Sequence, residues 1–202
     1  KALALGAGVV SLDVVAGAGA PAAGEHRLVV DLTDAQAVRD CFARIGRVDA
    51  LFNVAGGFAM GPTAWEVSSA DWDAMFRINV ATMHNAVRAA VPGMIAQGRG
   101  SIVNIGANSA REGQGNMGAY CAAKSVVMRL TESLSKELRA QGVNVNAVLP
   151  SLIDTERNRA DMPDADFSKW VKPEELANVI CFLGSDAASA VHGALIPVVG
   201  LS

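Results

Sequence analysis

Tyr120 and Lys124 are the two residues whose types and spacing best suit chemistry in this chain. They stand four positions apart in a segment with an apolar stripe of helical period, so both side chains fall on one helix face. An ammonium group there can stabilise a phenolate and lower the tyrosine pKa from its usual value of about 10. A tyrosine tuned in this way can donate or accept a proton near neutral pH. Since an ordinary helix start explains an isolated pair equally well, the surrounding segments must decide.

The composition narrows the class of protein. The 202 residues are 51% hydrophobic, which predicts one well-buried core and a single domain. The formal net charge is -3 and no cationic tract is present, which disfavours nucleic acid as a partner. The three cysteines and three histidines are scattered, which disfavours disulfides and predicts no metal site. No apolar run reaches membrane-spanning length, so we expect a cytoplasmic protein without a membrane partner.

Short β-branched runs alternate with longer helical patterns, which is typical of βα units wound into a parallel sheet. The expected strands are 9–13, 28–31, 50–55, 101–105, 143–149 and 194–199, and the expected helices are 34–45, 71–96, 119–140 and 173–183. The predicted fold class is therefore α/β, a doubly wound parallel sheet in three α/β/α layers. Gly17-x-Gly19 is interpreted as a loop, because Pro21 and Gly24 leave no room for a helix before the second strand.

A series of short motifs accompanies the expected strands. In chain order they are Asp31-Leu32, Asn53-Val54-Ala55-Gly56, Asn79, Tyr120-x-x-x-Lys124 and Pro150-Ser151-Leu152-Ile153-Asp154-Thr155. The series resembles the short-chain dehydrogenase/reductase family over nearly the whole chain. Each motif is weak alone, whereas their order and spacing together are strong. The resemblance implies a Rossmann-like oxidoreductase that uses NAD or NADP, acts on a small molecule, and forms a homodimer or homotetramer.

The resemblance also implies a role for each motif. Tyr120 would be the general acid/base, Lys124 would lower its pKa and bind the nicotinamide ribose, and Asn79 would anchor a water in a proton relay. The expected cofactor contacts are Asp13, Asp31, Leu32, Asn53, Ala55, Gly56, Tyr120, Lys124, Pro150, Ile153 and Thr155. Among them, Asp31 would contact the adenine, and Thr155 with the Ile153 backbone would hold the nicotinamide carboxamide. Asparagine is a mediocre helix former, so a local bulge is expected around Asn79, and an exposed polar helix face is the alternative.

Asp13 closes the first expected strand, at the edge where open α/β sheets bind ligands. A carboxylate there can accept hydrogen bonds from the adenosine ribose and repel a 2′-phosphate. We therefore expect NAD (NADH) to be preferred, with NADP as the alternative. A solvated turn aspartate is the competing interpretation of Asp13, and a surface threonine that of Thr155.

One departure from the family pattern concerns the substrate side. The family usually has a serine thirteen residues before the tyrosine, where its hydroxyl steadies the substrate carbonyl, and this position is Ala107. Either Asn108 or Ser109 takes over that role, or the substrate needs no such donor, which we favour. With the segment 149–170, Ala107 resembles the dihydropteridine reductase branch, which reduces a quinonoid dihydropterin with NADH. Such a reduction creates no alkoxide. A serine-lacking relative with another substrate, or with reduced activity, is the alternative.

A second departure concerns the glycine-rich turn that should follow a first strand and cradle the pyrophosphate. Residues 1–6 resemble the end of the first helix, so we expect the first strand and the phosphate-binding turn to be missing from this sequence.

Several functions stay open. A dihydropteridine reductase-like enzyme competes with a carbonyl reductase or alcohol dehydrogenase, and with a non-catalytic nucleotide-binding or assembly subunit. Apolar positions beyond one helical stripe favour pairing between subunits, and they are Met83, Val87, Val127 and Met128. Core filling is the alternative for Met128.

Overall fold

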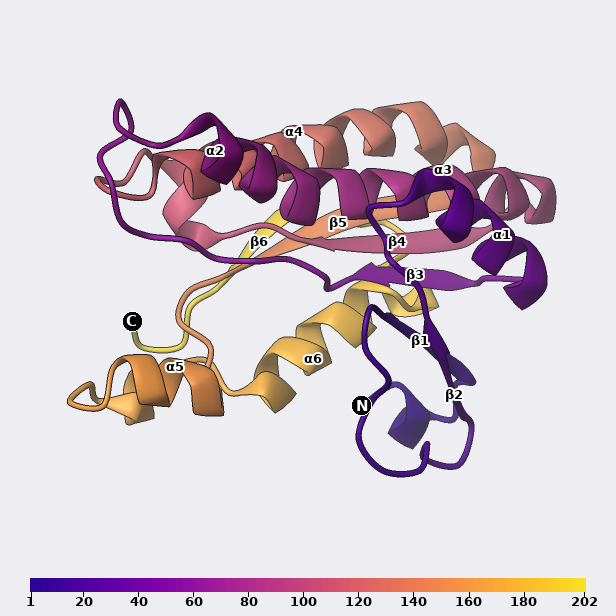
Figure 1. The fold of residues 1–202 in the computed structure, drawn as a ribbon. Coiled ribbons are helices and arrows are strands. Elements are labelled where there is room, and N and C mark those ends of the chain that lie inside the picture. Colours follow the sequence, from indigo (N-terminus) through magenta and orange to yellow (C-terminus); the bar gives the residue numbers. More distant parts are fainter.

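The computed structural model describes residues 1–202 and consists of parallel strands with helices on both sides (Figure 1). The strands are β1 (Val9–Asp13), β2 (Glu25–Val29), β3 (Ala50–Asn53), β4 (Gly100–Ile105), β5 (Val143–Pro150) and β6 (Leu195–Val198). The α-helices are α1 (Ala35–Ile45), α2 (Ser69–Phe76), α3 (Thr82–Gln97), α4 (Gly118–Leu138), α5 (Glu156–Asp161) and α6 (Pro173–Leu183). Figure 1 shows α2, α3 and α4 above the strands β3 to β6, with α1 beside α3, and α5 and α6 below these strands, which confirms the predicted three-layer α/β class.

The strands form two sheets, whereas one sheet was expected. β1 pairs with β2 alone, and β3, β4, β5 and β6 pair in that order, with every pairing parallel. A cavity of about 710 Å³ with mainly apolar walls lies between β1 and β3, and residues of both strands line it. Because no strand bridges this cavity, the facing edges of β1 and β3 carry no ladder hydrogen bonds and the two sheets stay separate.

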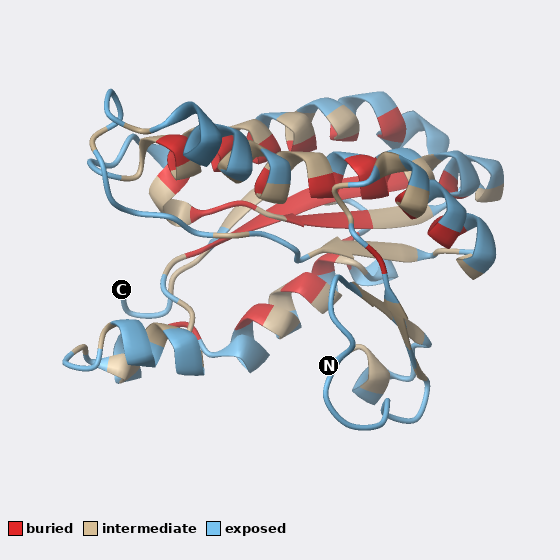
Figure 2. Cartoon of the chain, in the orientation of Figure 1, coloured by how far each residue is buried: buried red, intermediate tan, exposed pale blue.

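The hydrophobic core has one cluster on each face of the four-stranded sheet. Ile102 packs under α3 and α4 in the larger cluster, while its neighbour Val103 packs under α6 in the smaller one. This alternation follows from the two-residue period of a strand. Every residue of β5 is buried, and Figure 2 shows buried residues along the central strands and on the helices that cover them. Burying each valine or isoleucine contributes about 1.5–3 kcal/mol, so these strands form the most stable part of the fold.

The residues expected to favour pairing between subunits belong to this interior. Met83, Val87, Val127 and Met128 are all at most 5% exposed, so the prediction that they lie on a free surface was wrong. The physical reason is that α3 and α4 both pack against other helices as well as the sheet, which buries more than one stripe of each helix.

The helix boundaries follow local signals. α1 begins after Asp34, whose carboxylate accepts hydrogen bonds from the backbone N–H groups of Gln36 and Ala37. α6 begins at Pro173, as predicted, and Gly142 ends the short turn after α4 with a φ of 79°. The helix expected over 71–96 is divided into α2 and α3 by a π-helical turn at Arg77–Ala81.

Two further segments form short helices. Leu3–Leu5 forms a 3-10 turn, which Gly6 ends with a φ of 86°. α5 was not expected from the sequence, because its six residues are too few to show a periodic apolar pattern. None of the helices combines the length and the apolar character needed to cross a membrane.

Candidate active site

α4 carries the tyrosine and lysine of the predicted site in its first two turns. Lys124 is 6% exposed and Tyr120 is partly buried. The ammonium of Lys124 donates a hydrogen bond of 2.9 Å to the carbonyl oxygen of Ile105, the last residue of β4. The lysine therefore connects the helix to the carboxyl end of the central sheet.

Asn79 lies in the π-helical turn between α2 and α3 and is 2% exposed. The turn is wider than an α-turn, because the backbone N–H of Thr82 bonds to Arg77 five residues back. The side chain of Asn79 donates to the carbonyl oxygens of Met75, at 3.1 Å, and Gly57, at 3.0 Å, and its Oδ1 accepts from the Gly57 backbone N–H at 3.1 Å. The predicted bulge is confirmed, and it places the amide against the loop that follows β3.

Gly56 in this loop brings the two buried side chains together. A Cβ atom at Gly56 would lie 2.9 Å from Oδ1 of Asn79 and 3.2 Å from Nζ of Lys124, so a side chain here would collide with both. Ala55 and Gly56 are themselves exposed. Three segments that are distant in sequence therefore meet at one point: the turn after β3, the π-helical turn and α4.

Burial sets the charge of the tyrosine and the lysine. Loss of contact with water raises the pKa of Tyr120 to about 12, with a smaller contribution from the Cys121 thiol. Burial also lowers the pKa of Lys124 to about 8. The net shift of the Tyr120 pKa is therefore upward, because desolvation of the phenol outweighs the lowering expected from Lys124, whose ammonium bonds to the Ile105 carbonyl.

The substrate-side residues lie in a compact apolar surrounding. Ala107 is 3% exposed and packs with Cys121, Met128 and Leu149, and Tyr120 borders the same cluster. The Oδ1 atom of Asn108 is buried and has no hydrogen-bond partner. Ser109 contributes its carbonyl oxygen as an acceptor for the Cys121 thiol at 3.5 Å. A methyl group thus occupies the position where the family usually has a hydroxyl.

The acidic residues predicted for the adenosine side lie at the ends of the separate β1–β2 sheet. Asp13 is exposed, and its carboxylate accepts from the backbone N–H of Val15 at 3.2 Å. Asp31 accepts from the hydroxyl and the backbone N–H of Thr33, both at 2.8 Å, and these bonds lower its pKa. Leu32 packs against the larger core cluster, and its carbonyl accepts from Asn85 at 3.0 Å. Because β1 and β2 are parallel, both carboxylates lie at the same edge.

The residues predicted for the carboxamide side lie beyond β5. Pro150 is the buried last residue of that strand. Thr155 caps α5, since its hydroxyl oxygen accepts from the backbone N–H of Asn158 at 3.2 Å. The carbonyl of Ile153 accepts from the Asn158 side chain at 2.7 Å and from the Thr155 backbone at 2.9 Å. The capping bond leaves the hydroxyl hydrogen of Thr155 free to be donated to a ligand.

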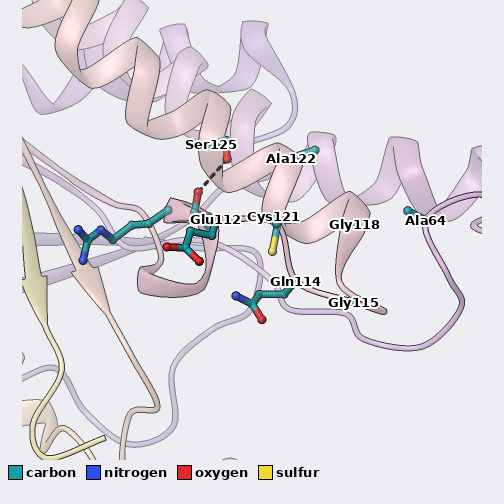
Figure 3. A pocket seen from close by; sticks show the side chains of 11 residues that line it. Ala64, Glu112, Gln114, Gly115, Gly118, Cys121, Ala122 and Ser125 are labelled. Atoms are coloured by element: carbon teal, nitrogen blue, oxygen red, sulfur yellow. Dashed lines mark hydrogen bonds between the residues drawn. The ribbon is translucent and has the colours of Figure 1, made fainter.

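Phe58 and a neighbouring cavity were not expected from the sequence. The Phe58 ring stands nearly perpendicular to the Tyr120 ring, with centroids 5.0 Å apart. A cavity of about 530 Å³ separates the loop 110–115 from the face of α4 that carries Cys121, with Ala64 at its far side (Figure 3). The Ser125 hydroxyl donates to the carbonyl of Ala110 at 3.0 Å and ties this loop to the helix. No motif marks these positions, because loops lack the periodicity from which side-chain directions are predicted.

A parallel α/β fold with a glycine, a bulged asparagine and a Tyr-x-x-x-Lys pair at the carboxyl ends of its strands defines a class of nucleotide-dependent oxidoreductases. The family model for short chain dehydrogenases matches residues 10–166. The chain belongs to the short-chain dehydrogenase/reductase family, and the protein is an NAD(P)-dependent oxidoreductase of that type.

Named relatives carry the same fold and several different activities. The chain is 32% identical to the 3-oxoacyl-[acyl-carrier-protein] reductase FabG of Thermotoga maritima, over 85% of this chain and 74% of the relative. It is 34% identical to the D-threitol dehydrogenase of Mycolicibacterium smegmatis, over 82% of this chain and 67% of the relative. The crystal structure of a gluconate 5-dehydrogenase from Burkholderia cenocepacia, in complex with NADP and tartrate, is similar with a TM-score of 0.80. Its identity is 30%, over 88% of this chain and 74% of that chain.

Proposed function

We propose that the protein transfers a hydride between a nicotinamide dinucleotide and a small substrate, with Tyr120 as the proton donor or acceptor. One observation carries this proposal. Gly56 lies against both Asn79 and Lys124, and Lys124 is one helical turn from Tyr120 on α4. A single coincidental Tyr-x-x-x-Lys pair would not be accompanied by a buried amide and a glycine at the same place.

The nicotinamide side of the site fits this cofactor class. Gly56 keeps the approach to Lys124 and Asn79 free of a side chain, which is the kind of space that a bound nicotinamide ribose requires. A bound dinucleotide supplies or accepts the hydride. Lys124 would hold the ribose through its ammonium, and Thr155 would donate its free hydroxyl hydrogen to the carboxamide. We propose that the other residues expected from sequence to contact the cofactor also do so, and that Ala55 contacts it through its backbone.

Tyr120 is suited to hold a proton until it is needed. Its raised pKa keeps the phenol neutral at physiological pH, so it begins as a proton donor in the reductive direction. After the proton leaves, the ammonium of Lys124 one helical turn away would stabilise the phenolate. Asn79 would hold a relay water at the backbone of Gly57, to which its amide already bonds.

Two substrate classes have specific support. The printed names of the relatives, among them a 3-oxoacyl reductase and a D-threitol dehydrogenase, favour a carbonyl compound or its alcohol. The methyl group of Ala107 favours a substrate whose reduction creates no alkoxide, and a quinonoid dihydropterin meets that condition. We propose a carbonyl or alcohol as the preferred substrate and the dihydropterin as the second candidate. The dihydropterin is supported by the single residue Ala107, whereas several named relatives support a carbonyl compound or its alcohol.

The cofactor form is a separate choice. Asp13 at the end of β1 favours NAD, because its carboxylate would repel a 2′-phosphate. Three similar structures of at least 30% identity are described with NADP bound, which favours the phosphorylated form. We propose NAD as the preferred cofactor on the basis of Asp13.

The test is a panel of cofactor and substrate pairs. Oxidation of NADH and NADPH is followed with acetoacetyl-CoA and with quinonoid dihydropterin, and reduction of NAD and NADP with D-threitol and gluconate. We expect turnover in one substrate class and a loss of about 10² to 10⁴ in Tyr120→Phe, the range of general acid–base catalysis. No turnover with any pair, or full activity of Tyr120→Phe, would contradict the proposal and favour a non-catalytic subunit.

Ala107→Ser separates the two substrate classes. A restored hydroxyl beside Tyr120 should raise turnover of a ketone and change turnover of a dihydropterin little. A cytoplasmic location and assembly into a homodimer or homotetramer stay predictions.

A further inference from the structure

A chain of hydrogen bonds between side chains crosses the protein from β3 to α4 beneath the proposed site. Asn53 donates to Oδ1 of Asn104 at 2.8 Å, and Asn104 donates to the hydroxyl oxygen of Thr131 at 2.9 Å. Thr131 in turn donates to the carbonyl of Val127 at 2.8 Å. Asn104 and Thr131 are both 0% exposed, so these polar groups depend on each other and have no access to water.

The same strand and the same helix carry the lysine contact. Asn104 precedes Ile105, whose carbonyl accepts from Lys124, and Thr131 follows Lys124 by seven residues, which is two turns of α4. β4 is therefore bound to α4 by polar contacts at two points about 10 Å apart along the helix axis. Two directional contacts add to the apolar packing of α4 and restrict both its rotation and its position along the strand.

The second contact between β4 and α4, from Asn104 to Thr131, is a hydrogen bond, which suggests a role in addition to stability. Ile102 and Val127 nearby show that apolar packing could fill this interface. Apolar contacts tolerate small sliding movements, whereas a hydrogen bond requires a defined direction and distance. An unpaired amide or hydroxyl would be costly in this dry interior, so displaced arrangements of α4 are disfavoured.

We propose that Asn104 and Thr131 are positioning residues that fix α4 so that the Lys124 ammonium stands between the Ile105 carbonyl and Gly56. The proposal rests on the proposed function of Tyr120 and Lys124, and it adds the device that places them. Asn53 extends the device to β3, from which the Gly56 turn continues. The Gly56 turn after β3 and Lys124 on α4 are thereby held in a fixed position relative to each other.

The position of Lys124 can be measured without substrate. Reductive methylation of the folded protein at a series of pH values, with peptide mapping by mass spectrometry, gives the pH at which this amine becomes reactive. Burial is the cause of its lowered pKa, and Tyr120 on the same helix is its titratable neighbour. A lysine that moves toward water should react with a midpoint closer to the usual value of about 10.4.

Each variant for this test changes one buried side chain of α4. Thr131→Val keeps the branched shape and removes the hydroxyl, so we expect the Lys124 midpoint to rise and turnover to fall by about tenfold to a hundredfold. Thr131→Ser keeps the hydroxyl and should restore both values. Ser135→Ala, a buried change one turn further along α4, is the matched control and should leave the midpoint unchanged.

Two outcomes distinguish this proposal from a purely structural bridge. If Thr131→Val lowers the melting temperature and leaves the Lys124 midpoint at the wild-type value, the positioning proposal is wrong. If Thr131→Val does not fold, Asn53→Ala at the less buried end of the chain should give a smaller rise of the midpoint, and no rise there would also overturn it. A shifted midpoint in a protein without any turnover would instead support the positioning device and contradict the proposed function.

Discussion

The two sheets of the protein differ in how they hold functional groups. In the four-stranded sheet and its helices, Asn79, Asn104 and Lys124 are buried and bonded to groups from other elements. In the two-stranded sheet no residue of β1 or β2 is buried, and the predicted cofactor carboxylates bond within their own turns. The residues proposed for proton chemistry therefore lie in the buried region, and the predicted adenosine contacts lie in the exposed one.

The difference has a physical reason. Withdrawal from water is the main cause of the pKa shifts of Tyr120 and Lys124, so this chemistry requires a buried site. A carboxylate that accepts hydrogen bonds from ribose hydroxyls must stay charged, and exposure to water favours the charged form. The buried region thus excludes water from its titratable groups, whereas the exposed region keeps its carboxylates in water. Substitutions in the buried region should therefore have the larger effects.

The largest effect is expected from Gly56→Ala, next to the buried side chains of Asn79 and Lys124. The new methyl group would displace Asn79 or Lys124, and a misplacement of about 1 Å can reduce turnover about a hundredfold. Steady-state kinetics with the active cofactor pair measures the loss. Gly61→Ala is the matched control, because nothing lies within 4 Å of its Cβ position. Equal activity of the two variants would mean that the close approach at Gly56 has no catalytic importance.

The pH dependence of stability tests the burial of Lys124. Its pKa is about 8 in the folded protein and 10.5 ordinarily, so folding disfavours the charged amine. The free energy of unfolding should therefore be lower below pH 8 and rise as the pH increases toward 10.5, by about 3 kcal/mol at most. Denaturant unfolding of the wild type and of Lys124→Met measures this rise, which the variant should lack.

Tyr120 gives the opposite sign at higher pH. Its raised pKa means that stability is present below pH 10 and is lost as the pH approaches about 12. The Lys124 measurement is therefore made below pH 10, and an identical pH slope in both proteins would contradict the burial of the lysine.

A smaller effect is expected from Asp13→Ser in the exposed region. Removing the carboxylate should shift the ratio of kcat/KM for NADPH over NADH upward by about tenfold, or 1.4 kcal/mol, since one repulsive charge is lost. Asp40→Ser, at an exposed aspartate on α1, controls for the change in net charge. An unchanged ratio would favour the interpretation of Asp13 as a solvated turn residue.

The smallest effect is expected from Glu25→Gln in the two-stranded sheet. Arg27 lies 2.9 Å from the Glu25 carboxylate and is the main cause of its pKa of about 2. Ion pairs near the surface contribute little to stability, so the melting temperature at neutral pH should fall only slightly. Thermal unfolding at neutral pH measures it, and a large fall would show that the two-stranded sheet is as tightly coupled to the fold as the central sheet.

Much of the fold was predictable from local patterns. The alternation of strand and helix periods gave the α/β class, and β1 and α6 have the bounds expected from sequence. The split into two sheets was not predictable, because pairing depends on which strands lie side by side. α5 was missed for a different reason, since it is held by the Thr155 cap and has too few residues for a pattern.

The sequence by itself determined that Tyr120 and Lys124 share a helix face, because a helical period of 3.6 residues is a local property. It also determined the motif order by which the family was recognised. Only the tertiary structure decided that Gly56 and Asn79 meet Lys124, and that burial raises the Tyr120 pKa when a decrease was expected. Contacts between distant segments and exclusion of water arise from the packing of the whole chain, so residue types and spacing could not supply them.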